Sequence, residues 1–305
     1  MEIRRETSLC RKWPAMIRDD FLRFRRSFHE RRPAPSGVKQ PYWMLMPQWL
    51  WTSFNEHKKS PRAGPRFLHD ILWAQHCLFM VLRLQDDLFD GEVAPHSLIY
   101  ASDLFLLECD RVLGRHFRQS PEFEIAKRGF LRKTIHGIVE ADALQSFPGN
   151  GYRSLPAEYR RQCALFKLGS FAVCLKAGRM KLFPRVSAYC DQMAVVGQIL
   201  DDVIDIREDF NRGRLNYAAS LILRPRRQTV PVKKRSLRQI ASNILRSDVA
   251  ESLLADLRGH LELAASTIAP LRLEPAAEYL IAYREAIEEM AKQIRRQRVK
   301  TLFGL

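Results

Sequence analysis

The sequence predicts an all-α fold, and three observations lead to that prediction. Apolar residues recur at three- and four-residue intervals along almost the whole chain of 305 residues, whereas strict alternation of apolar and polar residues is rare. The breaks between periodic segments fall at turn-forming sequences, and none resembles a long linker. Glycine (14) and proline (16) are sparse for an all-β or disordered chain. We expect a single domain over residues 1–305, a bundle of about ten helices around a central apolar cleft.

The individual helices follow from the same periodicity. The segment 66–90 shows it well, because its apolar residues form one broad face. Ser120 followed by Pro121 predicts a helix start, since serine caps helices and proline favours the first helical position. The basic stretch 220–235 contains two prolines and is expected to be a loop. The predicted helices cover residues 13–31, 43–57, 66–90, 97–114, 122–146, 157–182, 186–210 and 275–300, with two more inside 236–268.

Charge and cysteine usage restrict the class of protein. The formal net charge of +16 attracts anionic partners without saying which. The most basic stretch, Pro225–Arg238, contains no aromatic residue, so we expect no nucleic-acid binding, while peripheral contact with a membrane stays open. The six scattered cysteines are typical of a reducing compartment, where they pack as small hydrophobic residues. No secretory signal or membrane-spanning run is recognisable, so a cytoplasmic protein is expected.

Two acidic segments each end an apolar helix. In the first, Asp86 and Asp90 lie one turn apart on one helical face, with Asp87 beside them. Three aspartates are unfavourable at a helix C-terminus, which already carries partial negative charge, and a bound cation would offset this cost. The first segment is therefore a candidate metal site.

The second acidic segment lies 115 positions further along the chain, counting from residue 86 to residue 201. Asp201, Asp205 and Asp209 follow one another in steps of four along one helical face, and Asp202 is rotated about 100° away. Carboxylates are hard oxygen ligands, and Mg²⁺ is usually held by one or two of them together with substrate phosphate. Two such helices facing each other across a cleft would clamp a metal-bound diphosphate.

At these residues the sequence resembles the class I isoprenoid synthase superfamily, over about residues 66–217. The first segment resembles the DDxxD motif shared by trans-prenyl diphosphate synthases, terpene cyclases and squalene/phytoene synthases, and the second aligns with all three branches. The resemblance implies the isoprenoid synthase fold, two or three Mg²⁺ ions (with Mn²⁺ as an alternative), an allylic prenyl diphosphate as substrate, and a homodimer. It also implies metal ligands at Asp86, Asp87, Asp90, Asp201, Asp205 and Asp209, four of them (Asp86, Asp90, Asp201 and Asp205) catalytic, and substrate-binding roles for Lys167, Gln198, Arg212 and Arg214.

Some departures bear on the branch. Lys167 is followed by leucine where the elongating synthases have threonine, and a solvated helix lysine is an equal interpretation. No Gly-Lys-Arg element precedes the first motif, and no arginine follows Asp90 before Arg111. In elongating synthases such residues bind isopentenyl diphosphate. The sequence therefore favours cyclisation or elimination on one substrate, with condensation of two prenyl diphosphates as the alternative.

The apolar residues ahead of the first motif suggest where a prenyl chain would lie. An allylic cation must be shielded from water, so an apolar and aromatic pocket is expected. Its candidate members also fit ordinary core packing, and they are Trp73, Leu78, Phe79, Val81 and Leu82.

Two other classes remain as alternatives. A phosphohydrolase of the HD type is suggested by His69-Asp70 with His57 upstream, although it leaves both acidic motifs unexplained. The other is a basic helical protein without catalysis that binds nucleic acid or membrane, whose binding would weaken with salt and survive removal of Mg²⁺.

Overall fold

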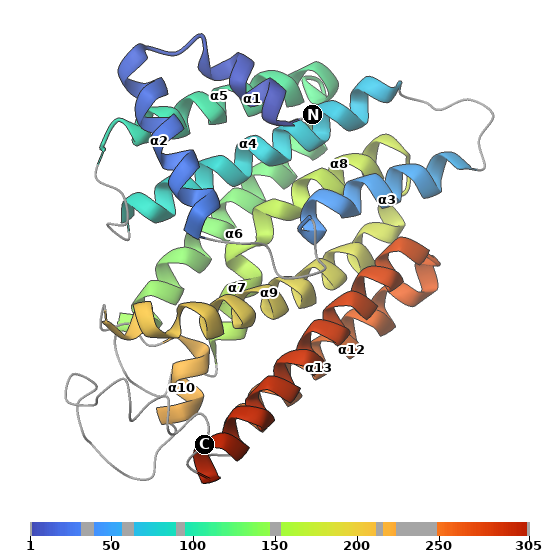
Figure 1. Cartoon of the computed structure of the whole chain (residues 1–305). Helices are drawn as coiled ribbons and strands as arrows, with labels where there is room; N and C mark the ends of the chain where they lie inside the picture. Colours follow the sequence, from blue (N-terminus) through green and yellow to red (C-terminus); the bar gives the residue numbers. More distant parts are fainter. Residues whose placement is uncertain are drawn as a thin grey trace. The chain divides into compact units, whose positions relative to one another are not determined.

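The computed structural model describes residues 2–31, 40–56, 64–89, 95–146, 154–211, 216–223 and 249–303. Every regular element among them is helical, so the prediction of an all-α fold is confirmed (Figure 1). Twelve α-helices and three short 3-10 helices are described. No helix within these ranges is long and apolar enough to cross a membrane.

The chain divides into two compact units, which are considered separately. Unit 1 comprises Met1–Arg128 and Leu165–Phe183, and unit 2 comprises Gly129–Ala164 and Pro184–Leu305. Each unit therefore gathers segments that are distant in the sequence. The predicted single domain with a central cleft depends on how these two units associate, so it stays a prediction.

Unit 1 has an aromatic core. The ring of Trp13 packs edge-on against Phe21 and Phe105 at centroid distances of 5.4 and 5.2 Å, and Phe117 stacks on Phe123 at 4.0 Å. Edge-to-face and stacked rings at such distances contribute beyond the area they bury. The helices that carry this core are α1 (Glu2–Cys10), α2 (Ala15–Arg31), α3 (Tyr42–Glu56), α4 (Pro65–Phe89), α5 (Leu98–Phe117), the start of α6 (Pro121–Ser146), the end of η2 (Ala164–Lys167), α8 (Leu168–Lys176) and η3 (Met180–Leu182).

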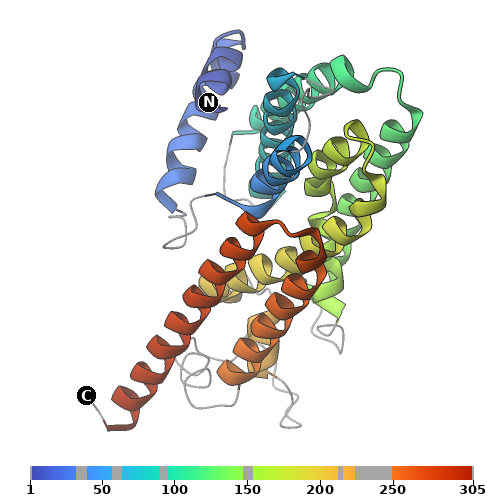
Figure 2. The same cartoon turned by 90° about the vertical axis from the view of Figure 1, so that its right-hand side faces the viewer.

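Unit 2 is built on the long helix α9. Tyr159, Tyr189 and Val195 are almost completely buried, so this core again combines aromatic and β-branched side chains. Helices α12 and α13 lie side by side as a hairpin, which both views show (Figures 1 and 2). The helices of unit 2 are the rest of α6, α7 (Leu155–Gln162), α9 (Phe183–Asn211), α10 (Tyr217–Leu223), α12 (Val249–Ile268), η5 (Ala269–Leu271) and α13 (Glu274–Phe303).

Most predicted helices are found within a few residues of their expected ends. The start of α6 is also confirmed, because the Phe123 amide donates to the hydroxyl of Ser120, which directly precedes Pro121. The single helix predicted over 157–182 is wrong, since α7, η2, α8 and η3 divide this segment. Helices α1 and α10 were not predicted. The loop expected over 220–235 is wrong at its start, because α10 continues to Leu223, and the rest of that stretch lies outside the described residues. Of the stretch 236–268 only residues 249–268 are described.

A buried glutamine explains one of the breaks in 157–182. Gln75 on α4 donates from Nε2 to the backbone oxygen of Phe166 in η2 (2.9 Å) and to that of Trp43 in α3 (3.1 Å). The Trp43 oxygen would normally accept a bond from residue 47, but Pro47 has no amide hydrogen. A Cβ at Gly169 would lie 2.8 Å from the Gln75 side chain, so glycine allows this close approach. These are tertiary contacts, and the local apolar pattern does not reveal them.

Candidate active site

The first aspartate row lies in the last turn of α4. Asp86 and Asp87 are described, and Asp90 lies outside the described residues. Neighbouring residues on a helix point about 100° apart, and here the two side chains have opposite surroundings. The Asp86 side chain is 52% exposed, whereas Asp87 is completely buried. Of these two carboxylates, Asp86 is the one that a metal ion or a phosphate can reach from solvent.

One buried arginine binds both aspartates. Arg83 donates from Nη1 to Asp86 Oδ2 at 3.0 Å and forms a close ion pair with Asp87 through Nη2. The spacings i,i+3 and i,i+4 place these side chains on the same part of the helix surface. A buried carboxylate without a counter-charge would be costly, so Arg83 explains why Asp87 is tolerated in the interior of unit 1. Sequence reasoning gave Arg83 no role, although its helical spacing could have suggested the pair.

Lys167 lies at the junction between η2 and α8. Its side chain is buried, with a residue exposure of 7%, so it is not the solvated helix lysine that the sequence also allowed. Burial of an ammonium group is unfavourable unless it is paired. Lys167 can therefore contact only groups that reach into this nearly closed part of unit 1.

The apolar residues ahead of the first row are not all alike. Phe79 is half-buried and stacks on Trp43 at 5.3 Å, and the Trp43 ring stacks in turn on Phe166 at 4.8 Å. Leu82 is half-buried, whereas Leu78 and Val81 are buried. Trp73 donates from its indole nitrogen to Glu108 on α5 at 3.0 Å. Phe79 therefore belongs to a three-ring aromatic cluster, and Trp73 serves the packing of α4 against α5.

The second aspartate row follows α9 in unit 2. Asp201 is exposed, and Asp205, Asp209 and Gln198 are partly exposed. Because four residues exceed one helical turn by only about 40°, the three aspartates follow one side of the helix. The structure thus presents a continuous row of carboxylates at this surface of unit 2.

Asp202 differs from its neighbours because it is buried, with 7% exposure. Its Oδ2 atom accepts hydrogen bonds from the Tyr159 hydroxyl (2.6 Å) and the Tyr217 backbone amide (2.8 Å). Burial raises the pKa of Asp202 to about 8, and the charges of Asp209 and Asp201 add to the rise. The two hydrogen bonds act in the opposite direction and lower this pKa, but they do not outweigh burial. Asp202 therefore anchors α9 to α7 and α10.

Asn216 connects Asp202 and Asp209. Its Nδ2 atom donates to the backbone oxygen of Asp202 (2.8 Å) and to Oδ2 of Asp209 (2.7 Å), while its Oδ1 atom accepts from the amide of Ala219. The last bond caps the first turn of α10, a role that asparagine often plays. Asn216 was missed from the sequence, although an asparagine directly before a helix is a recognisable cap. No sequence signal pointed to Tyr159.

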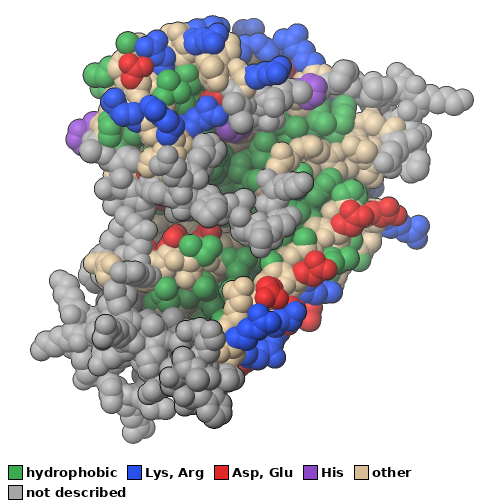
Figure 3. All heavy atoms as spheres, in the orientation of Figure 1, with side chains coloured by type: hydrophobic (Ala, Val, Ile, Leu, Met, Phe, Trp, Pro, Cys, Tyr) green, Lys and Arg blue, Asp and Glu red, His purple; other side chains and the backbone are tan. Residues whose placement is uncertain are grey.

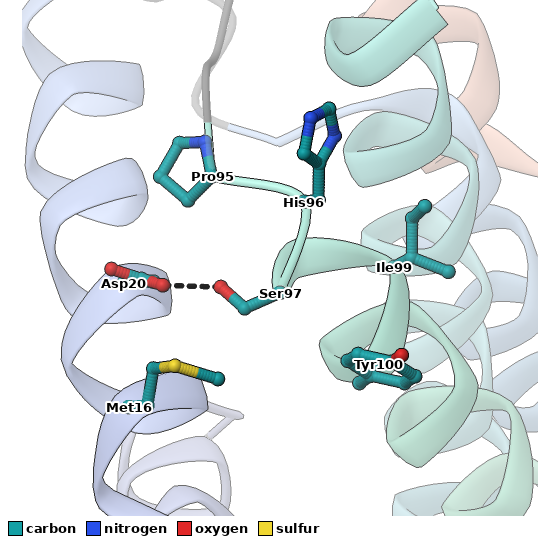
Figure 4. Close-up of a pocket in the computed structure, with 7 residues that line it drawn as sticks. All are labelled: Met16, Asp20, Pro95, His96, Ser97, Ile99 and Tyr100. Atoms are coloured by element: carbon teal, nitrogen blue, oxygen red, sulfur yellow. Dashed lines mark hydrogen bonds between the residues drawn. The ribbon is translucent and has the colours of Figure 1, made fainter.

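A cavity of about 430 Å³ in unit 1 is lined by none of the predicted site residues. It lies between α2 and the start of α5, where the Ser97 hydroxyl donates a hydrogen bond to Asp20 (Figure 4). This bond, together with the guanidinium of Arg23, lowers the pKa of the Asp20 carboxyl against the effect of burial. The lining residues are Met16, Asp20, Pro95, His96, Ser97, Ile99 and Tyr100.

The structure thus describes seven of the ten predicted site residues. Two, Asp86 and Asp87, lie together at the end of α4, and Lys167 lies elsewhere in unit 1. Gln198, Asp201, Asp205 and Asp209 share one helix in unit 2. The remaining three, Asp90, Arg212 and Arg214, lie outside the described residues.

No protein-family model and no curated protein matches this sequence. Solved structures do match. The heptaprenyl diphosphate synthase from Staphylococcus aureus is 13% identical, with a TM-score of 0.69 over 94% of this chain and 97% of its own. The octaprenyl pyrophosphate synthase from Helicobacter pylori is 14% identical, with a TM-score of 0.67 over 92% and 97%. A polyprenyl synthase from Roseobacter denitrificans is 14% identical, with a TM-score of 0.62 over 93% and 99%.

These likenesses define the class of fold. The chain has the isoprenoid synthase fold, and the resemblance inferred from the aspartate motifs is confirmed at this level. More particularly, its structural matches are polyprenyl and farnesyl diphosphate synthases. At such low identity the match describes the fold and assigns no residue a role.

Proposed function

We propose that this chain is a Mg²⁺-dependent class I enzyme that ionises an allylic prenyl diphosphate and transfers the prenyl group to a second prenyl diphosphate. One observation carries the proposal: in a chain with the isoprenoid synthase fold, two long helices each have at least one aspartate that is open to solvent at the predicted motif. On α4 this aspartate is Asp86, and on α9 the aspartates are Asp201 and Asp205.

The available ligands fit magnesium by their chemistry. Asp86, Asp201, Asp205 and Asp209 are carboxylate residues that are at least partly exposed, and Mg²⁺ prefers oxygen ligands. Among the described residues, no three His, Cys, Asp or Glu side chains converge as a metal site. Mg²⁺ commonly needs only one or two carboxylates when a phosphate completes its shell. We propose Asp90, which follows Asp86 by four positions in the sequence, as a further ligand. Asp87 would become a ligand only if its buried ion pair with Arg83 opened, and with that pair in place it holds Arg83 next to Asp86.

The bound metal would stabilise the negative charge that develops on the leaving diphosphate. The chain's own contribution is to hold that group and to keep the allylic cation away from water. We assign diphosphate binding to Lys167, Gln198, Arg212 and Arg214, and shielding of the prenyl chain to the half-buried Phe79 and Leu82. Preorganised charge of this kind is effective because it needs no rearrangement as the bond breaks.

The sequence by itself favours a reaction of one substrate, whereas we propose condensation of two. The three solved structures named above are those of a heptaprenyl, an octaprenyl and a polyprenyl synthase, and this likeness of fold favours the alternative reaction. Cyclisation or elimination remains the second candidate, because no arginine lies between Asp90 and Arg111 to bind isopentenyl diphosphate. A homodimer and contact with a membrane stay predictions.

The test is incubation of the purified chain with Mg²⁺ and C10, C15 and C20 allylic diphosphates, each with and without isopentenyl diphosphate. A longer prenyl diphosphate, formed only when both substrates are present, supports condensation. Hydrocarbon or alcohol from one substrate alone supports the second candidate. Absence of diphosphate release under every condition contradicts both.

A further inference from the structure

A group of basic side chains in unit 1 converges on one buried carboxylate at the first turns of α4. Asp70 is 1% exposed and lies 3.0 Å from Nε2 of His116. Three guanidinium groups also face it, from Arg5 on α1 (3.4 Å), Arg115 on α5 (3.6 Å) and Arg66 on α4 (3.7 Å). We call these five residues the Asp70 cluster.

The cluster contains more positive charge than its carboxylate can neutralise. Arginine stays protonated in proteins, so three guanidiniums against one carboxylate leave a net charge of about +2 even with His116 neutral. Glu108 also acts on Arg115, but its two oxygens each accept a 2.6 Å hydrogen bond from Arg111. Like charges held this close repel one another, most strongly next to buried groups.

The position of the cluster on α4 adds to the imbalance. Arg66 lies in the first turn of the helix, which contains no acidic residue. A helix N-terminus carries partial positive charge and stabilises anions rather than cations. Twenty residues separate Arg66 from Asp86 by sequence number, about 30 Å along a helix. The Asp70 cluster is therefore distinct from the first aspartate row.

Arg66 and Arg115 lie beyond hydrogen-bond distance of Asp70, whereas Arg5 donates to Asp70 at 3.4 Å and to the backbone oxygen of His69 at 3.2 Å. The contacts of all three arginines with Asp70, at 3.4 to 3.7 Å, are longer than the ~2.8 Å typical of a charge-assisted hydrogen bond. The side chains of Arg5, Arg66 and Arg115 are 35%, 72% and 37% exposed. Lys176 adds a further charge nearby, since its Nζ lies 5.9 Å above the Phe67 ring that packs against His116.

We propose that the Asp70 cluster is a binding site for a phosphate group, either free phosphate or the headgroup of an anionic lipid. Guanidinium groups suit this ligand because their planar donors match phosphate oxygens. Asp70 and His116 form the floor of the site and orient the arginines. A bound phosphate would relieve the repulsion between the arginine side chains. Figure 3 shows Lys and Arg side chains also gathered on the visible surface of α1 and α2, which would guide an anion towards unit 1. The proposal does not rest on the proposed catalytic function.

The first experiment measures thermal unfolding and isothermal titration of the whole chain with potassium phosphate, against potassium chloride at equal ionic strength. Both are done in EDTA, so that metal-dependent binding at the aspartate rows cannot contribute. Phosphate is expected to raise the melting temperature more than chloride does. The double variant Arg66→Gln/Arg115→Gln should bind phosphate roughly 10- to 100-fold more weakly.

The design separates binding from folding. The double variant keeps Arg5, Asp70 and His116, and in chloride it should melt at the same temperature as the unaltered chain or above it, because repulsion is relieved. The control Arg128→Gln/Arg132→Gln removes two exposed arginines of α6 and the same charge, and it should keep the full phosphate response. Equal effects of phosphate and chloride, an unchanged response of the double variant, or an equal loss in the control would each overturn the proposal.

A second experiment distinguishes the two sources of phosphate. The chain is sedimented with phosphatidylcholine vesicles with and without phosphatidylglycerol. Retention that needs phosphatidylglycerol and is lost only in the Arg66→Gln/Arg115→Gln variant identifies a lipid headgroup. Phosphate binding without such retention identifies a free phosphate ligand.

Discussion

Helices α4 and α9 carry the same Asp-Asp pair, in the last turn of α4 and about three turns before the end of α9, and the surroundings of the two pairs are similar but not identical. In each pair the first aspartate, Asp86 or Asp201, is exposed, and the second, Asp87 or Asp202, is buried. Asp87 is paired with a charged group from its own helix, Arg83. Asp202 instead accepts hydrogen bonds from Tyr159 and Tyr217 of other helices.

This difference teaches how two adjacent aspartates are accommodated on a helix that packs against a core. The helical rotation of about 100° sends one carboxylate to solvent and the other into the core. An ion pair can be supplied locally, by a residue one turn earlier. Neutral donors have to come from elsewhere in the unit, and for Asp202 they do not offset burial, which raises its pKa to about 8.

The largest expected effect concerns the exposed members of both pairs. Asp86→Ala and Asp201→Ala should each lower diphosphate release by roughly 10³-fold, because each removes a proposed metal ligand from the place where negative charge would develop. Release is measured with Mg²⁺ and an allylic diphosphate, and circular dichroism checks the fold. Asp103→Ala, an exposed aspartate of α5, is the matched control and should keep full activity. Wild-type turnover in both variants would remove the basis of the proposed function.

The next effect tests the local ion pair. Arg83→Met should lower the free energy of unfolding by about 3 kcal/mol, because it removes the guanidinium that faces the buried Asp87 charge. Urea denaturation at neutral pH measures this loss. The double variant Arg83→Met/Asp87→Leu should recover most of it, since a buried ion pair can often be replaced by apolar residues. No recovery would mean that packing of the arginine, and not charge, is what matters.

A smaller effect is expected at the second buried aspartate. Tyr159→Phe removes one donor from Asp202 but leaves the Tyr217 amide in place, so the loss should be about 1–2 kcal/mol. The same denaturation series measures it, with Tyr283→Phe, another tyrosine of unit 2, for comparison. A loss as large as that of Arg83→Met would show that the neutral network is as important as the ion pair.

The smallest expected effect is a pH dependence of stability at Glu108, which belongs to neither aspartate pair. Burial acts to raise the pKa of Glu108, but hydrogen bonds from Arg111 and Trp73 outweigh it and lower the pKa below its usual value. A carboxyl with a lowered pKa in the folded state stabilises above its unfolded pKa and loses this contribution as pH falls through the folded pKa. Glu108→Gln should therefore cost a few tenths of a kcal/mol at neutral pH and nothing in acid. A constant difference between the melting temperatures of variant and wild type from neutral to acid pH would contradict this.

Much of the fold and part of the candidate site could be predicted because they depend on local periodicity. The helix ends near Phe89 and Asn211 and the spacing of Asp201, Asp205 and Asp209 were all readable, since 3.6 residues per turn relates sequence to helical face. The break between α7 and α8 was not readable, because a glutamine from α4 stabilises it. Asn216 and Tyr159 likewise act across 14 and 43 positions of sequence.

By itself the sequence determined that the chain is helical, that aspartates follow the apolar parts of two helices, and that their oxygens suit Mg²⁺, which can in turn bind a diphosphate. These properties follow from residue type and helical period. Only the tertiary structure decided which aspartate of each pair is buried, which partner each one has, and that Arg5, Arg66 and Arg115 share one carboxylate. Burial and pairing depend on residues far away in sequence, and folding alone brings those together.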